Sequence, residues 1–136
     1  MFIVDTNVVS ELRRPARANP GVAAWAAAVP IADIYLSAIT VLELELGVLL
    51  MERRDAAQGR VLRDWLDGRV TPRFAGRVLA VDDAVARRCA RLHAAAPRAD
   101  RDALIAATAL VHGLTVVTRN IADFAGAGIA LLNPWR

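Results

Sequence analysis

The sequence predicts an α/β fold: an α/β/α sandwich with a short, mainly parallel central sheet of four to five strands. Short, continuously apolar segments alternate with longer amphipathic or alanine-rich segments along the whole chain. Strands of a parallel sheet are covered on both faces and therefore have this apolar character. No linker, internal repeat or low-complexity segment interrupts the 136 residues. We therefore expect a single domain over residues 1–136.

Each expected element has a local signal. The apolar segments that we expect as strands are 2–4, 33–38, 77–81, 114–118 and 129–132. Helices are expected over residues 7–13, 20–29, 40–54, 56–70, 82–96 and 102–112, the third and fourth of them as a helical hairpin. Asn19 and Pro20 form a strong start signal for the second helix. Gly113 is a suitable residue to end the last one.

Composition excludes several classes of protein. An apolar fraction of 56% excludes a disordered chain, and no apolar run reaches the roughly 18 residues that span a membrane. The N-terminal segment lacks the basic region of a signal peptide. Cys89 is the single cysteine, so no internal disulfide can form, and we expect a reducing cytoplasmic setting.

The net charge is +3, and every basic residue is arginine. This composition is compatible with phosphate contacts, because arginine has a fork of donors, but it also fits a coding bias. The absence of lysine excludes mechanisms that need one.

Acidic residues recur where strands end. Asp5 follows the first apolar segment directly, where it could cap a helix or serve chemistry, and Thr6 could share either role. Glu43 lies in a helix that is apolar on nearly all sides, and Thr40-x-x-Glu43 matches a capping box. Glu45 points about 200° away from Glu43 and is expected to face solvent or an arginine.

Two later stretches show the same pattern. Asp102 opens an alanine-rich helix, where it competes with Asp100 as the N-cap. Thr118 and Asn120 follow the fourth strand, and Asp123 comes three residues later. Asn120 could form a turn, and Asp123 could cap a short one. Because ligands bind at the carboxyl ends of parallel strands, these groups are candidates for one site.

A cluster of carboxylates is unfavourable unless its negative charge is compensated. Two of them in contact repel by roughly 4 kcal/mol at an effective dielectric constant of about 20, so such a cluster requires a cation or a raised pKa. Ligands that are all oxygen suit Mg²⁺, with Mn²⁺ as the alternative. Aspartyl-phosphate chemistry would need a lysine, and a P-loop is absent. Of the reactions that a carboxylate-bound Mg²⁺ supports, metal-assisted attack of water on a phosphodiester is the one compatible with this sequence.

The stretches "VDTNVVSEL", "LSAITVLELELG", "DALIAATALVHGLTVVTRN" and "NPWR" resemble the PIN-domain ribonucleases, specifically the VapC-type toxins. "FAGRVL" and "NPWR" further resemble the FitB-like branch. The resemblance implies a Mg²⁺-dependent endoribonuclease, the toxin of a type II toxin–antitoxin system. The implied catalytic and metal-binding residues are Asp5, Glu43, Asp102 and Asp123, with Thr6, Thr118 and Asn120 in support. Some relatives have aspartate at the position of Asn120, so the fourth ligand is either Asn120 or Asp123.

The resemblance also implies homodimers and a cognate antitoxin that blocks the acidic pocket and contacts operator DNA. Arginines such as Arg13, Arg14 and Arg119 are candidates for RNA backbone contacts. An alternative is a non-enzymatic partner in an antitoxin–operator complex, whose carboxylates grip an arginine instead of a metal. A DNA-directed nuclease is a third interpretation.

Overall fold

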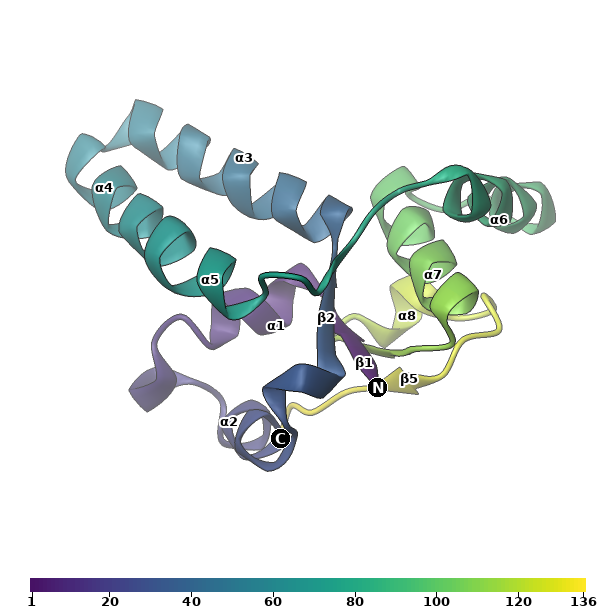
Figure 1. Cartoon of the computed structure of the whole chain (residues 1–136), viewed down its shortest axis with the longest axis horizontal. Helices are drawn as coiled ribbons and strands as arrows, with labels where there is room; N and C mark the ends of the chain where they lie inside the picture. The colour runs from purple at the N-terminus through teal and green to yellow at the C-terminus, as the bar shows by residue number, and fades with distance from the viewer.

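A five-stranded, fully parallel sheet forms the centre of the molecule in the computed structural model, which describes residues 1–136. The strand order is β3-β2-β1-β4-β5, so the first strand is the central one (Figure 1). The strands are β1 (Phe2–Val4), β2 (Ile34–Ser37), β3 (Val78–Leu79), β4 (Thr115–Val117) and β5 (Leu131–Leu132). The predicted α/β architecture with a parallel sheet is therefore confirmed.

Helices cover both faces of this sheet. They are α1 (Thr6–Glu11), α2 (Pro20–Ala28), α3 (Ala38–Arg54), α4 (Ala56–Trp65), α5 (Thr71–Arg73), α6 (Asp83–Ala95), α7 (Asp100–His112) and α8 (Ile121–Phe124), with short helical turns at Pro15–Arg17, Ile31–Asp33 and Leu66–Val70. One buried cluster joins the sheet to α6, α7 and α8, and another joins it to α1, α2, α3 and the 66–70 turn. Ile3 belongs to the first cluster and Val4 to the second, as the alternation of side chains along a strand requires.

Several predicted helix boundaries are correct. The Asn19 side chain accepts a hydrogen bond from the Gly21 amide at 3.0 Å, with Pro20 at the first helical position. Gly113 ends α7 in the left-handed region at φ 66°, which glycine adopts without steric cost.

Two predicted helix starts are wrong. Ser37 caps α3, because its hydroxyl accepts from the Ile39 amide at 3.0 Å. The proposed capping box of Thr40 and Glu43 therefore lies inside the helix, and the Thr40 hydroxyl is buried without a partner. Asp102 does not cap α7 either, since that helix begins at Asp100 with Ala99 in the cap position.

The predicted helical hairpin is present and consists of α3 and α4 (Figure 1). The expected helix over residues 56–70 changes at Leu66–Val70 into a π-helical turn and continues as α5. Glu45 faces an arginine, as predicted: it pairs with Arg63 at 2.5 Å. None of the helices is long and apolar enough to cross a membrane.

Candidate active site

The candidate site lies at the carboxyl edge of the sheet, where β1 and β4 end side by side. Val4 pairs with Val117 in the parallel ladder, so the next residues of each strand, Asp5 and Thr118, are neighbours. The Asp5 amide donates to the Val117 carbonyl at 2.9 Å, which extends the ladder to the aspartate itself. The backbone register therefore fixes Asp5 against Thr118, although 113 residues separate them in the chain.

Asp5 is held by a set of three donors. One carboxylate oxygen accepts from the Thr6 amide at 2.8 Å, and the other accepts from the Thr118 hydroxyl at 2.8 Å and the Asn7 amide group at 3.3 Å. Only 6% of Asp5 is exposed. Asp5 is also the N-cap of α1. The capping role expected from the sequence is therefore confirmed, with one oxygen on the helix start, while the other oxygen accepts from Thr118 and Asn7.

Glu43 reaches the same edge from the second turn of α3. Its carboxylate accepts from the Thr6 hydroxyl at 2.8 Å, so Thr6 links Asp5 to Glu43 with its amide and its side chain. The second Glu43 oxygen lies 3.8 Å from the guanidinium of Arg101. Both partners of Glu43 therefore come from other elements, α1 and α7.

The remaining acids approach the same centre. The pKa of Asp102 is raised by burial first and then by the charges of Asp123, Asp5 and Glu43. Burial also raises the pKa of Asp5, against the lowering effect of the Thr118 and Thr6 hydrogen bonds, and the charges of Glu43 and Asp123 raise it further. The four predicted carboxylates therefore lie close enough together for their charges to repel.

Asn120 and Asp123 contribute differently. The Asn120 amide donates to the Thr118 hydroxyl at 3.0 Å, while its side chain makes no capping bond to α8. Asp123 lies within α8, and its charge acts on both Asp5 and Asp102. Asp123 is therefore the better match to a fourth acidic position, and Asn120 orients Thr118 through its backbone.

The donor set fits a hard divalent cation. No three of the acidic, histidine or cysteine side chains converge tightly enough to surround one ion by themselves. Mg²⁺ does not need such a cage, because it keeps several waters and binds through one or two carboxylates together with substrate phosphates. Burial first, and then the charges of neighbouring carboxylates, raise the pKa of Asp5 and of Asp102, and a cation would relieve the repulsive part.

Two further residues, Asn7 and Arg101, contact the predicted side chains of this site. The Asn7 side chain donates to Asp5 and to the Thr118 hydroxyl at 3.3 Å each, and it accepts from the Arg119 amide at 3.3 Å. The position of Asn7, two residues after Asp5, was the one feature of the sequence that could have indicated its place in the site. Arg101, next to Asp102 in the chain, is the second, and its proximity to Glu43 was not visible without the fold.

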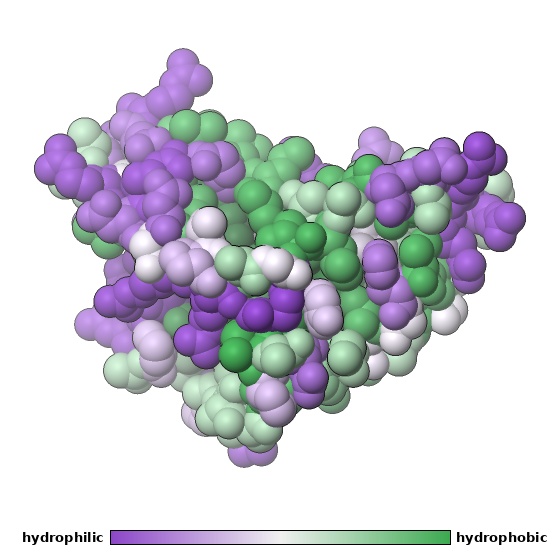
Figure 2. Space-filling model, in the orientation of Figure 1, coloured by the Kyte–Doolittle hydropathy of each residue, from purple (hydrophilic) through white to green (hydrophobic).

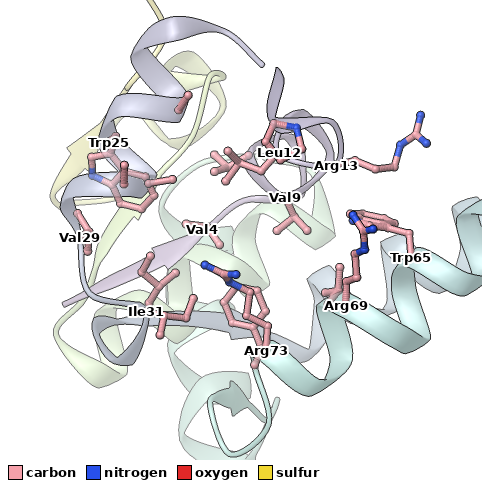
Figure 3. Close-up of a pocket in the computed structure, with 18 residues that line it drawn as sticks. Val4, Val9, Leu12, Arg13, Trp25, Val29, Ile31, Trp65, Arg69 and Arg73 are labelled. Carbon is pink, nitrogen blue, oxygen red and sulfur yellow. The ribbon is translucent and has the colours of Figure 1, made fainter. Parts of the chain in front are cut away.

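A separate apolar cavity of about 390 Å³ lies on the α1–α2 side of the sheet. Figure 3 shows Trp25 and Trp65 on opposite sides of it, with Arg69 and Arg73 reaching in from the segment after α4. Its size lies within the range of about 300–1,000 Å³ that is typical of binding pockets. The apolar lining excludes it as the site of hydrolytic chemistry and favours the binding of an apolar group.

The parallel sheet and its acidic carboxyl edge are those of an α/β nuclease, as the comparison with known families shows. The family model for the PIN domain matches residues 2–127, and the chain belongs to this family.

Relatives extend over nearly the full chain. It is 43% identical to Toxin FitB of Neisseria gonorrhoeae over 140 residues, which cover 99% of each protein. It is also 43% identical to VapC ribonuclease Y4jK of Sinorhizobium fredii over 143 residues, covering 99% of this chain and 98% of the relative. A solved structure described as FitAB bound to the IR36 DNA fragment matches with a TM-score of 0.89 and 40% identity, covering 100% of this chain and 96% of that one.

Proposed function

We propose that this protein is the toxic component of a type II toxin–antitoxin system and acts as a Mg²⁺-dependent endoribonuclease, with Mn²⁺ as the alternative metal. The buried Asp5 carries this proposal, because three donors fix it while the carboxylates of Glu43 and Asp123 repel it. The relatives named a toxin and a ribonuclease support the same conclusion.

Each residue of the site has a role in this proposal. Asp5 and Asp102 would be the principal metal ligands, and Glu43 and Asp123 would complete the acidic set. A bound Mg²⁺ would lower the pKa of a coordinated water and stabilise the leaving oxygen of the phosphodiester.

The remaining groups orient these carboxylates. Thr118 and Asn7 fix one oxygen of Asp5, and the Thr6 amide fixes the other. The Thr6 hydroxyl sets the direction of Glu43, and the Asn120 amide sets that of the Thr118 hydroxyl. A set of carboxylates held in this way needs little reorganisation when the site is loaded, which is the condition for effective electrostatic catalysis.

An antitoxin is the partner that we propose for the apolar cavity. Its lining is mainly apolar, and Arg13, Arg69 and Arg73 supply positive charge. A segment with apolar and acidic side chains would complement this surface. Operator DNA would then be contacted through the antitoxin, consistent with the FitAB–DNA structure of a relative.

We further propose that residues 1–136 act as one PIN domain in the cytoplasm, where the RNA substrate is found, and that the protein forms a homodimer. The exposed face of α3 supports the dimer, since Figure 2 shows apolar surface along this helix. The exposed apolar residues on it are Val41, Leu42, Leu46, Leu49 and Leu50. Sedimentation of Leu46→Glu against the wild type tests this: a monomeric wild type, or a variant that still dimerises fully, contradicts the proposal.

The decisive experiment is RNA cleavage by Asp5→Asn and Asp102→Asn. We expect each to lose at least about 100-fold in kcat/KM, since metal-assisted charge stabilisation contributes several kcal/mol. Asp64→Asn is the matched control, because Asp64 is exposed on α4, in the hairpin. Cleavage at the wild-type rate by either site variant, with the fold verified by circular dichroism, would refute the proposal.

The non-enzymatic alternative has one observation in its favour, the approach of Arg101 to Glu43 at 3.8 Å. It shows that the acidic edge accepts a guanidinium, as it would from an antitoxin. Calorimetric titration with Mg²⁺ separates the two functions. Binding at millimolar or lower concentration supports the nuclease, and its absence together with no RNA cleavage supports the binding role.

A further inference from the structure

The last residues of the chain occupy a specific seat on α2. After β5, Asn133–Arg136 runs to the start of α2, where the Asn19 side chain donates to the Arg136 carbonyl at 2.9 Å and accepts from the Arg136 amide at 3.1 Å. Gly21 makes this contact feasible, because a Cβ there would lie 2.1 Å from the Pro134 carbonyl oxygen. This seat therefore fixes the segment in one position relative to the sheet.

The Asn133–Arg136 segment places Trp135 against Arg119, the residue that follows Thr118. The guanidinium of Arg119 lies 5.6 Å from the centre of the Trp135 ring, within the distance of a cation–π interaction. The Arg119 amide donates to Asn7, and the preceding residue, Thr118, donates to Asp5. The backbone of Arg119 is therefore bound to Asn7, a hydrogen-bond partner of Asp5, and its side chain lies over the tryptophan ring.

Arg119 carries an unmatched positive charge. It is exposed and forms no ion pair with any aspartate or glutamate, although an acidic cluster lies nearby. An arginine held on an aromatic face keeps its donors free, and its restricted motion lowers the entropic cost of binding. Such a group is suited to a phosphate oxygen.

More arginines lie close to the seat. The Asn19 amide donates to Glu11 at 2.8 Å, and Glu11 lines a small polar hollow with Arg13, Arg14 and Arg17. The positive charge near the Asn133–Arg136 segment therefore extends beyond Arg119. This distribution favours a polynucleotide with several phosphates over a small phosphorylated ligand.

We infer that Arg119 binds a phosphate of the RNA next to the scissile one, and that Trp135, fixed by the seat on Asn19 and Gly21, is the positioning residue that holds Arg119 there. This inference rests on the proposed nuclease function. It assigns to the Asn133–Arg136 segment a role in substrate binding that is separate from metal binding.

Cleavage of a fluorescent RNA oligonucleotide tests the inference through KM and its salt dependence. Arg119→Gln is expected to raise KM about tenfold, the effect of one charge-assisted hydrogen bond, and to reduce the salt slope by about 0.7. Trp135→Leu should raise KM by a smaller factor, and Trp135→Phe should restore most of the loss because its ring remains. Arg87→Gln, on the exposed face of α6, is the control and should leave KM unchanged.

The double variant distinguishes positioning from a structural role. If Trp135 acts through Arg119, adding Trp135→Leu to Arg119→Gln should raise KM no further, because the two residues form one unit. A further rise equal to that in the wild-type background would overturn the positioning role.

An unchanged KM in Arg119→Gln, in a protein that cleaves RNA, would overturn the phosphate contact while the nuclease function stands. A wild-type protein that neither cleaves nor binds RNA would overturn both.

Discussion

The α3–α4 hairpin and the carboxyl edge of the sheet both contain several acidic side chains. Several of those in the hairpin are paired with an arginine, and most of those at the sheet edge are not. In the hairpin, Arg63 lies 2.5 Å from Glu45, 3.3 Å from Glu52 and 3.5 Å from Asp67. The pKa of Glu45 is lowered, chiefly by its hydrogen bond with Arg63. At the sheet edge, the only arginine within 4 Å of a carboxylate of the site is Arg101, at 3.8 Å from Glu43.

The difference separates acids that contribute to stability from acids reserved for a ligand. A neutralising arginine favours the charged form of Glu45, whereas burial and repulsion disfavour the charged form of Asp5 and Asp102. Groups whose charge opposes folding are typical of functional sites, where stability is given up for activity.

The largest effect on stability should come from filling the acidic edge. Mg²⁺ at ten times its Kd should stabilise the wild-type protein by roughly 1.4 kcal/mol, which raises Tm by several degrees for a chain of this size. Asp102→Asn should melt at a higher temperature than the metal-free wild type, because repulsion is relieved, and should lose the Mg²⁺ response.

Differential scanning calorimetry with and without Mg²⁺ measures both changes. Asp64→Asn serves again as the control and should keep the full response. A metal-free Asp102→Asn that melts well below the wild type would assign that carboxylate a structural role instead.

An intermediate effect should come from pH. A carboxylate whose pKa is raised in the folded state binds more protons there than in the unfolded chain, so its contribution to stability is present at low pH and is lost as pH rises through the folded pKa. Acidifying the metal-free protein from neutral pH should therefore first raise Tm through Asp5 and Asp102.

Glu45 acts in the opposite direction at lower pH, because its lowered pKa gives stability that is lost as pH falls through the folded value. The profile of Tm against pH should therefore pass through a maximum. In Asp102→Asn, Tm should change less with pH near neutrality than it does in the wild type. An unchanged slope there would contradict the proposed repulsion between the carboxylates of the site.

The smallest effect should follow Arg63→Gln. Its partners are partly exposed, and ion pairs of that kind contribute little. We expect a slight loss of thermal stability and unchanged RNA cleavage, measured side by side with Arg87→Gln. A strong loss of cleavage would show that the hairpin and the sheet edge are coupled.

The fold was predictable where a local signal sufficed. Asn19 with Pro20 and the left-handed Gly113 act on their own backbone, so their helix boundaries follow from sequence alone. The capping box of Thr40 and Glu43 failed because Ser37 caps α3 three residues earlier, which places Thr40 and Glu43 inside the helix. Two hydroxyl residues were available as the cap, and the end of β2 at Ser37 decides between them.

The same distinction applies to the site. The approach of its carboxylates to one edge was predictable, because Asp5 follows a strand and the other three lie in the first two turns of helices. The contact of Arg119 with Trp135 and the seat of Arg136 on Asn19 were not, because both depend on the path of the chain after β5. The roles of Asp5, Glu43, Asp102 and Asp123 in catalysis remain predictions that the variants above address.

The central position of β1 has a consequence for the time at which activity can arise. Thr118, the partner of Asp5, is synthesised 113 residues after it, and β1 needs β4 beside it before the edge exists. Translation adds about 5–20 residues per second, so several seconds pass between the synthesis of Asp5 and that of the strand that completes the edge. A nuclease built in this order stays inert until β4 has been synthesised and has paired with β1.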